Sequence, residues 1–98
     1  MQRKIHLKFL QAREIFEIGL MVQKAKAEFG GTNYYSHPLL DKLREFIYNP
    51  KNYKSELELI NKEIGWAAEW LNAIPYRDEE QDKLWKFLML ATKLGAPE

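Results

Sequence analysis

Apolar residues recur at three- and four-residue spacing through most of this chain of 98 residues, which is the period of an amphipathic α-helix. Four segments show the spacing, and turn residues separate them. The pattern predicts helices at about residues 5–29, 37–48, 55–73 and 78–94. Because the connections are short, we expect a compact all-α bundle of four helices in a single domain, residues 1–98.

Glycine and small polar residues mark the ends of these segments. Gly30 and Gly31 predict the end of the first helix, since glycine readily adopts the left-handed conformation that closes a helix. Ser36 is the predicted N-cap of the second helix. Ser55 with Glu58 has the spacing of a capping box and predicts the start of the third.

The beginning of the first segment admits a second interpretation. Ile5, Leu7 and Phe9 alternate with basic residues, as the two faces of a half-buried strand do. A single short strand without an evident partner would be unstable in water. A helix over residues 5–29 is therefore the prediction adopted here.

Two of the helices are more apolar than a single stripe facing a core requires. The first has a second apolar face, and the last is apolar almost all round between Leu84 and Leu90. In one interpretation the other helices cover this surplus within the monomer. In the other, the surplus is an interface with another protein or with a second copy of the chain.

The third helix places Glu63 inside a wide apolar arc, next to Trp66 and Trp70. A buried carboxylate is costly unless it is paired or hydrogen-bonded. Either Glu63 reaches solvent or a lysine, or it is a partly buried acid in a pocket or interface. The predicted interface residues on the three apolar helices are Leu7, Leu10, Ile18, Met21, Trp66, Trp70, Trp85 and Met89.

Motifs for catalysis and for cofactor binding are absent from the sequence. Without cysteine there is no thiolate nucleophile and no cysteine-based metal site. Glycine patterns that bind phosphates or dinucleotides and the paired-histidine zinc motif are also missing. His6 is assigned to a basic patch, and His37 is interpreted as a solvated residue of a first helical turn. We therefore expect a protein that is not an enzyme and has no metal or cofactor.

Charge is unevenly distributed, although the net charge is only +1. Residues 1–54 hold ten Lys/Arg against five Asp/Glu, a balance of +5, and residues 55–98 hold five against nine, a balance of −4. One interpretation is mutual attraction of the two halves within one fold. The other is a basic surface that binds an acidic partner or nucleic acid through phosphate pairing and base stacking. The candidate nucleic-acid contacts are Arg3, Lys4, Lys8, Lys24, Lys26, Tyr34, Tyr35, Lys51 and Lys54.

These patterns favour a small non-enzymatic protein–protein interaction module, such as an adaptor, an accessory subunit or an inhibitor of a larger protein. A homodimer is the simplest form of self-association. No stretch approaches the length of a membrane span, and the absence of cysteine favours a reducing compartment, so we expect a soluble cytoplasmic protein. The alternative is a nucleic-acid-associated protein that uses the basic N-terminal half. A pI of about 7.9 is low for such a protein.

Overall fold

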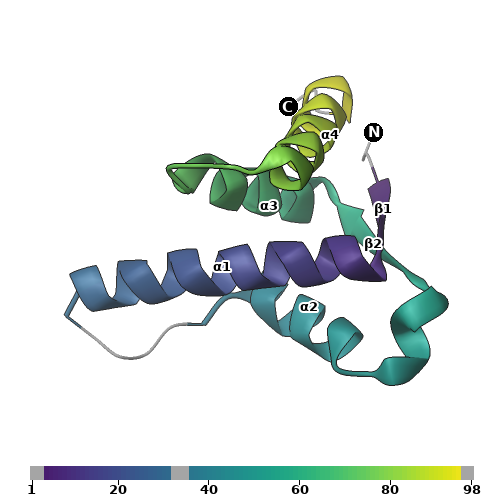
Figure 1. Cartoon of the computed structure of the whole chain (residues 1–98), viewed down its shortest axis with the longest axis horizontal. Helices are drawn as coiled ribbons and strands as arrows, with labels where there is room; N and C mark the ends of the chain where they lie inside the picture. Colours follow the sequence, from purple (N-terminus) through teal and green to yellow (C-terminus); the bar gives the residue numbers. More distant parts are fainter. Residues whose placement is uncertain (1–3, 32–35, 96–98) are drawn as a thin grey trace.

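A computed structural model of the chain describes residues 4–31 and 36–95 (Figure 1). Its elements, in chain order, are β1 (Lys4–Lys8), α1 (Phe9–Phe29), α2 (Pro38–Ile47), the short 3-10 helix η1 (Pro50–Lys54), β2 (Glu56–Ile60), α3 (Asn61–Ala73) and α4 (Glu79–Gly95). The four predicted helices are therefore confirmed. The fold is mostly helical but not all-α, because it includes a small sheet.

The sheet has two antiparallel strands, β1 and β2, with His6 opposite Glu58 and Ile5 opposite Leu59. The predicted helix starts at residues 5 and 55 are wrong for one shared reason. Both segments alternate apolar and polar side chains, and each supplies the partner that the other lacks. Ile5 and Leu59 are buried, whereas His6 and Glu58 are exposed, so one face of the sheet covers the core.

The N-cap of α2 is His37 rather than the predicted Ser36. The Nδ1 atom of His37 accepts a hydrogen bond of 3.1 Å from the backbone N–H of Leu39. The imidazole also packs edge-on against two indoles, with ring centroids 4.6 Å from Trp66 and 5.0 Å from Trp70. His37 is therefore a half-buried link between α2 and α3, and not the solvated residue that the sequence predicts.

Glu63 fixes the start of α3, which begins after Ile60 and not at the predicted Ser55–Glu58 capping box. Its Oε1 accepts a hydrogen bond of 3.0 Å from the backbone N–H of Ile60. The same oxygen lies 2.7 Å from Nζ of Lys42 on α2. Of the two interpretations of Glu63, the one in which it reaches a lysine is observed. The carboxylate satisfies a backbone donor and an ammonium group together, which offsets the cost of its burial.

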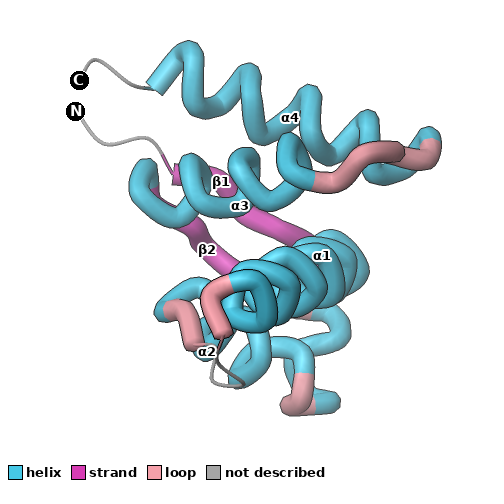
Figure 2. The backbone as a smooth tube through the Cα atoms, turned by 90° about the vertical axis from the view of Figure 1, so that its left-hand side faces the viewer, coloured by secondary structure: helices cyan, strands magenta, loops and turns pink. Residues whose placement is uncertain are grey.

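The helices are arranged around α1. Figures 1 and 2 show α2 on one side of α1, α3 on the other, and α4 beyond α3. Gly19 of α1 permits a close approach of α3, because a Cβ atom at this position would overlap the ring of Trp70. The largest fully buried side chains come from both strands and all four helices: Leu7, Ile15, Leu39, Leu40, Leu43, Leu59, Ile64, Leu71 and Leu88.

Candidate protein-interaction site

The structure divides the eight predicted interface residues among core, margin and surface. Three are buried in the core: Leu7, Ile18 and Trp70. Two are half-buried and pack against the core: Trp66 and Trp85. Three lie at the surface: Leu10, Met21 and Met89, which are 60%, 55% and 37% exposed. The second apolar face of the first helix is therefore only partly covered by the rest of the chain.

All three indole rings have contacts within the chain, although the buried Nε1 of Trp85 has no hydrogen-bond partner among the described residues. Nε1 of Trp70 donates a hydrogen bond of 3.2 Å to Oε1 of Gln23 and so connects α3 to α1. The ammonium group of Lys62 lies 5.1 Å from the ring centroid of Trp66, and the guanidinium group of Arg77 lies 4.2 Å from that of Trp85. These cation–π contacts cover the outer faces of half-buried rings. The exposed aliphatic residues, rather than the tryptophans, are left as candidate contacts.

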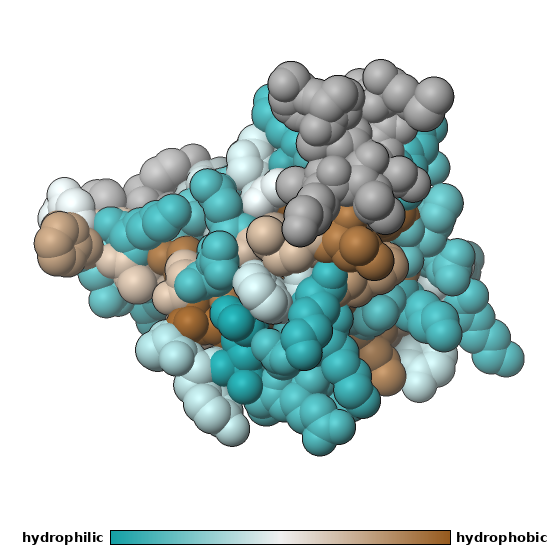
Figure 3. All heavy atoms as spheres, turned by 90° about the horizontal axis from the view of Figure 1, so that it is seen from above, coloured by the Kyte–Doolittle hydropathy of each residue, from teal (hydrophilic) through white to brown (hydrophobic). Residues whose placement is uncertain are grey.

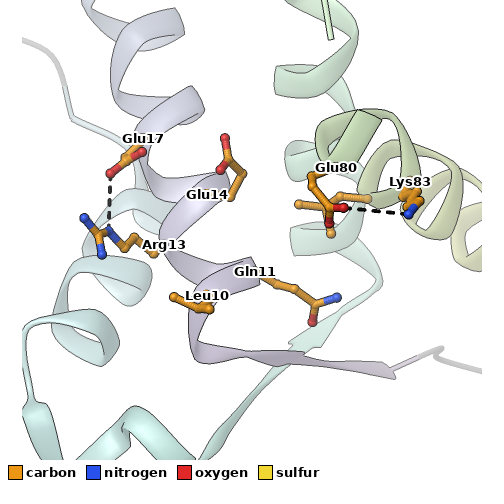
Figure 4. Close-up of a pocket in the computed structure, with 8 residues that line it drawn as sticks. Leu10, Gln11, Arg13, Glu14, Glu17, Glu80 and Lys83 are labelled. Carbon is orange, nitrogen blue, oxygen red and sulfur yellow. Dashed lines mark hydrogen bonds and ion pairs between the residues drawn. The ribbon is translucent and has the colours of Figure 1, made fainter. Parts of the chain in front are cut away.

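A concavity of about 630 Å³ lies between α1 and the first turns of α4 (Figure 4). Its lining residues are Leu10, Gln11, Arg13, Glu14, Glu17, Glu80, Lys83 and Leu84. A second depression of about 540 Å³ continues along α1 and is lined by Glu17, Leu20, Met21, Lys24, Ala25 and Glu28. Glu17 belongs to both sets. We call the two together the α1–α4 groove.

Helical spacing explains which residues of α1 face the groove. Leu10, Glu14, Glu17 and Met21 follow one another at intervals of four, three and four residues, so they form a single stripe. Leu10 and Met21 end this stripe, and the two carboxylates lie between them. An apolar–acidic–apolar stripe thus runs along the exposed side of the longest helix.

One side of α4 adds four residues that are missing from the predicted interface. Glu80 and Lys83 line the concavity, and Phe87 and Leu90 follow on the same side of the helix by spacing. Phe87 is 41% exposed and Leu90 is 56% exposed. Figure 3 views the molecule from above Figure 1, and apolar residues reach the surface among hydrophilic ones on this face. The sequence shows that α4 is apolar all round, but not which side remains uncovered.

The charged groups of the groove are unequally neutralised. Arg13 pairs with Glu17 at 3.4 Å, and Lys83 lies 3.7 Å from the carboxylate of Glu80. Glu14 is half-buried, and its Oε2 accepts a hydrogen bond of 2.9 Å from the amide of Gln81. No cation among the described residues pairs with Glu14, so the groove is acidic near its centre.

The basic candidates for nucleic-acid contact are not gathered into one patch. Lys4 and His6 lie 3.6 and 3.5 Å from the carboxylate of Glu58 on the neighbouring strand. Lys24 and Lys26 lie near the C-terminal end of α1. A helix of 21 residues is about 30 Å long, so they are far from β1 at the other end.

The remaining nucleic-acid candidates lie elsewhere in the chain. Lys51 and Lys54 are exposed in η1, whose Tyr53 ring lies 5.3 Å from that of Phe9 at the start of α1. Lys8 is exposed at the end of β1. The other three candidates are outside the described residues: Arg3, Tyr34 and Tyr35.

The described part of the chain has neither a cluster of metal ligands nor a membrane-spanning helix. Residues 4–31 and 36–95 contain no group of three or more His, Asp or Glu side chains able to hold a metal ion. Within the same residues no helix combines the length and the apolar character needed to cross a bilayer.

Comparison with protein-family models, curated proteins and solved structures gave no match. The geometry of the α1–α4 groove is therefore the basis for the functional proposal.

Proposed function

We propose that this protein is a small non-enzymatic interaction module that binds another protein through the α1–α4 groove. The supporting observation is the convergence of exposed apolar side chains on a concave surface. Leu10 and Met21 of α1 line the groove, and the exposed Phe87 and Leu90 follow its lining residues along α4 by helical spacing. Scattered apolar residues are normal on protein surfaces, but a concave cluster with a polar rim is typical of a docking site.

The four side chains are large enough to anchor a partner. Fully burying a Leu, Met or Phe side chain contributes about 1.5–3 kcal/mol, and roughly half of that remains available for a side chain that is half-exposed. Hot spots of interfaces are few and central, and charged residues around them exclude water and select the partner. The stripe Leu10–Glu14–Glu17–Met21 has this composition along one helix.

Within this proposal the module serves as an adaptor, an accessory subunit or an inhibitor of a larger protein. A chain without cysteine suits a reducing compartment, so the proposed location is the cytoplasm. The groove offers no histidine or serine as a catalytic group among its lining residues. The exposed apolar side chains beside the groove support a binding role.

The experiment compares proteins captured by three tagged forms of the chain. Leu10→Ser/Met21→Ser removes apolar surface from the groove. Tyr48→Ser removes a comparably exposed aromatic residue at the end of α2, outside the groove lining. Circular dichroism first confirms that all three forms are folded. We expect proteins that are retained by the wild type and by Tyr48→Ser but lost from the groove variant. Equal retention by all three forms, or none by the wild type, overturns the proposal.

Self-association is tested in parallel by light scattering. The expected result is the monomer mass of 11.7 kDa for both the wild type and the groove variant. Doubling of the mass in the wild type alone would place a second copy in the groove. That result would replace binding to another protein with the homodimer expected from the surplus apolar residues.

A further inference from the structure

Building on the proposed function, we infer that the α1–α4 groove accepts a basic amphipathic helix of another protein. The helix presents apolar anchors to Leu10 and Met21 and a Lys or Arg side chain to Glu14. Two independent features of this surface support the assignment. One is the straight apolar–acidic–apolar stripe on α1, and the other is the carboxylate of Glu14, which has no cationic partner among the described residues.

The shape of the site favours a helical occupant. The stripe from Leu10 to Met21 covers eleven residue steps of α1, which is about 16 Å at the helical rise. A helix laid along α1 repeats its apolar anchors at the same three- and four-residue intervals, so it meets both ends of the stripe. α4 forms the second wall at the end near Leu10, where Glu80, Lys83 and Leu84 line the concavity.

The charges of the site favour a basic occupant. Figure 4 shows Glu14 on α1 and Glu80 on α4 at opposite sides of the concavity. Arg13 and Lys83 are engaged with Glu17 and Glu80, but within residues 4–31 and 36–91 Glu14 receives only the neutral amide of Gln81. An incoming ammonium or guanidinium group would supply the missing charge in a half-buried setting. Charge-assisted hydrogen bonds are stronger there than at a fully exposed site.

A second copy of the chain fits this stripe poorly. If α1 pairs with α1 of a second copy in antiparallel orientation, with Leu10 opposite Met21, then Glu14 lies opposite Glu17. In parallel orientation each carboxylate faces its own counterpart. Both arrangements place like charges together, which opposes association and favours a heterologous partner.

The test uses synthetic fluorescent helices of about 18 residues with one shared leucine face, long enough to be helical when bound. The residues beside that face are Arg, Gln or Glu in three otherwise identical peptides. Fluorescence anisotropy measures their affinity for the whole protein. Glu14→Gln keeps an oxygen that can accept the Gln81 hydrogen bond and removes only the charge. Glu45→Gln removes an exposed charge from α2, outside the groove, as the matched control.

We expect the Arg helix to bind wild type about tenfold more tightly than the Glu helix at low salt. Glu14→Gln should weaken the Arg helix about threefold and leave the Gln helix unchanged, since one partly exposed charge pair is lost. Glu45→Gln should have no effect. Leu10→Ser should weaken all three peptides, because each uses the same apolar anchor.

The outcomes separate this inference from the function on which it rests. Equal binding of the Arg, Gln and Glu helices, with loss in Leu10→Ser, overturns the basic occupant and leaves the groove as an interface. Failure of all three peptides, together with partner capture that depends on Leu10 and Met21, likewise overturns only the helical, basic occupant. Binding of the Arg helix that is unaffected by Leu10→Ser places it elsewhere and counts against both proposals.

Discussion

Gln81 and Glu14, which are 67 positions apart in the chain, are joined by a hydrogen bond of 2.9 Å from the amide Nε2 to the carboxylate Oε2. The other end of the same amide caps α4. Oε1 of Gln81 accepts from the backbone N–H of Asp78 at 3.0 Å, and Oδ1 of Asp78 accepts from the N–H of Gln81 at 2.8 Å. Gln81, in the first turn of α4, therefore both caps this helix and connects it to Glu14 of α1.

Replacement of Gln81 tests this connection. Gln81→Glu keeps an oxygen for the N–H of Asp78 but places a carboxylate against Glu14. We expect the free energy of unfolding to fall by about 1–2 kcal/mol, because a hydrogen bond is exchanged for repulsion between like charges. The double variant Glu14→Gln/Gln81→Glu restores a donor and an acceptor and should recover most of the loss. Urea denaturation of the wild type, the two single variants and the double variant measures the coupling between the two side chains. Purely additive effects would show that they do not interact.

His37 makes the stability of the fold depend on pH. Burial, followed by the nearby charge of Lys26, lowers the pKa of His37 below its ordinary value of 6.5, although Glu69 and Asp41 act in the opposite direction. The hydrogen bond to Leu39 has the same consequence, because Nδ1 can accept it only while it carries no proton.

The unfolded chain therefore binds a proton at His37 more readily than the folded chain, and acid favours unfolding. The contribution of His37 to the free energy of unfolding is complete above pH 6.5. It is lost as the pH falls through the lowered pKa of His37 in the folded state. His37→Asn retains a capping oxygen that does not titrate in this range. Unfolding free energies measured from about pH 8 to about pH 5 should fall less steeply in this variant. Identical slopes in the two proteins would contradict the assignment.

Two glycines within helices should respond to alanine in opposite directions. A Cβ atom at Gly19 would overlap the ring of Trp70, so Gly19→Ala should reduce the free energy of unfolding by about 1–3 kcal/mol. A Cβ atom at Gly65 would have no other atom within 4 Å, and alanine is the better helix former by about 1 kcal/mol. Gly65→Ala should therefore stabilise the protein. Thermal denaturation of both variants checks the pair, and a stabilising Gly19→Ala would show that α1 and α3 are not closely packed.

Nucleic-acid binding should be weak even at low salt. Lys4 and His6 share the carboxylate of Glu58, and the remaining basic candidates are spread between the two ends of α1. The protein should therefore leave the electrophoretic mobility of a short single-stranded oligonucleotide unchanged at low ionic strength. A shift that disappears steeply as salt rises would instead identify the basic half as a binding surface.

Periodicity along the sequence predicts the helices well because it is a local property. The four helices were identified from residues close together in the chain. The sheet was not, since residues 4–8 and 56–60 become strands only by pairing with each other over a long separation. Leu57, Ile60 and Ile64 also have helical spacing, so the alternation of β2 is masked by a competing pattern.

The site shows the same division between local and tertiary information. Spacing places Ile18 and Met21 together on the second apolar face of the first helix, but only the packing shows that Ile18 is covered and Met21 is not. The charge asymmetry of the two halves also involves tertiary contacts. Lys4 with Glu58 and Lys42 with Glu63 connect the basic half to the acidic half, as the interpretation of mutual attraction predicts.

Site-specific photo-cross-linking in living cells tests whether another protein occupies the α1–α4 groove. A photoreactive amino acid at position 10 or 21 lies in the groove, and the same group at position 48 lies outside its lining. We expect positions 10 and 21 to form adducts with a different protein and position 48 to form none. Adducts formed equally from all three positions, or only with a second copy of the chain, would contradict this proposal.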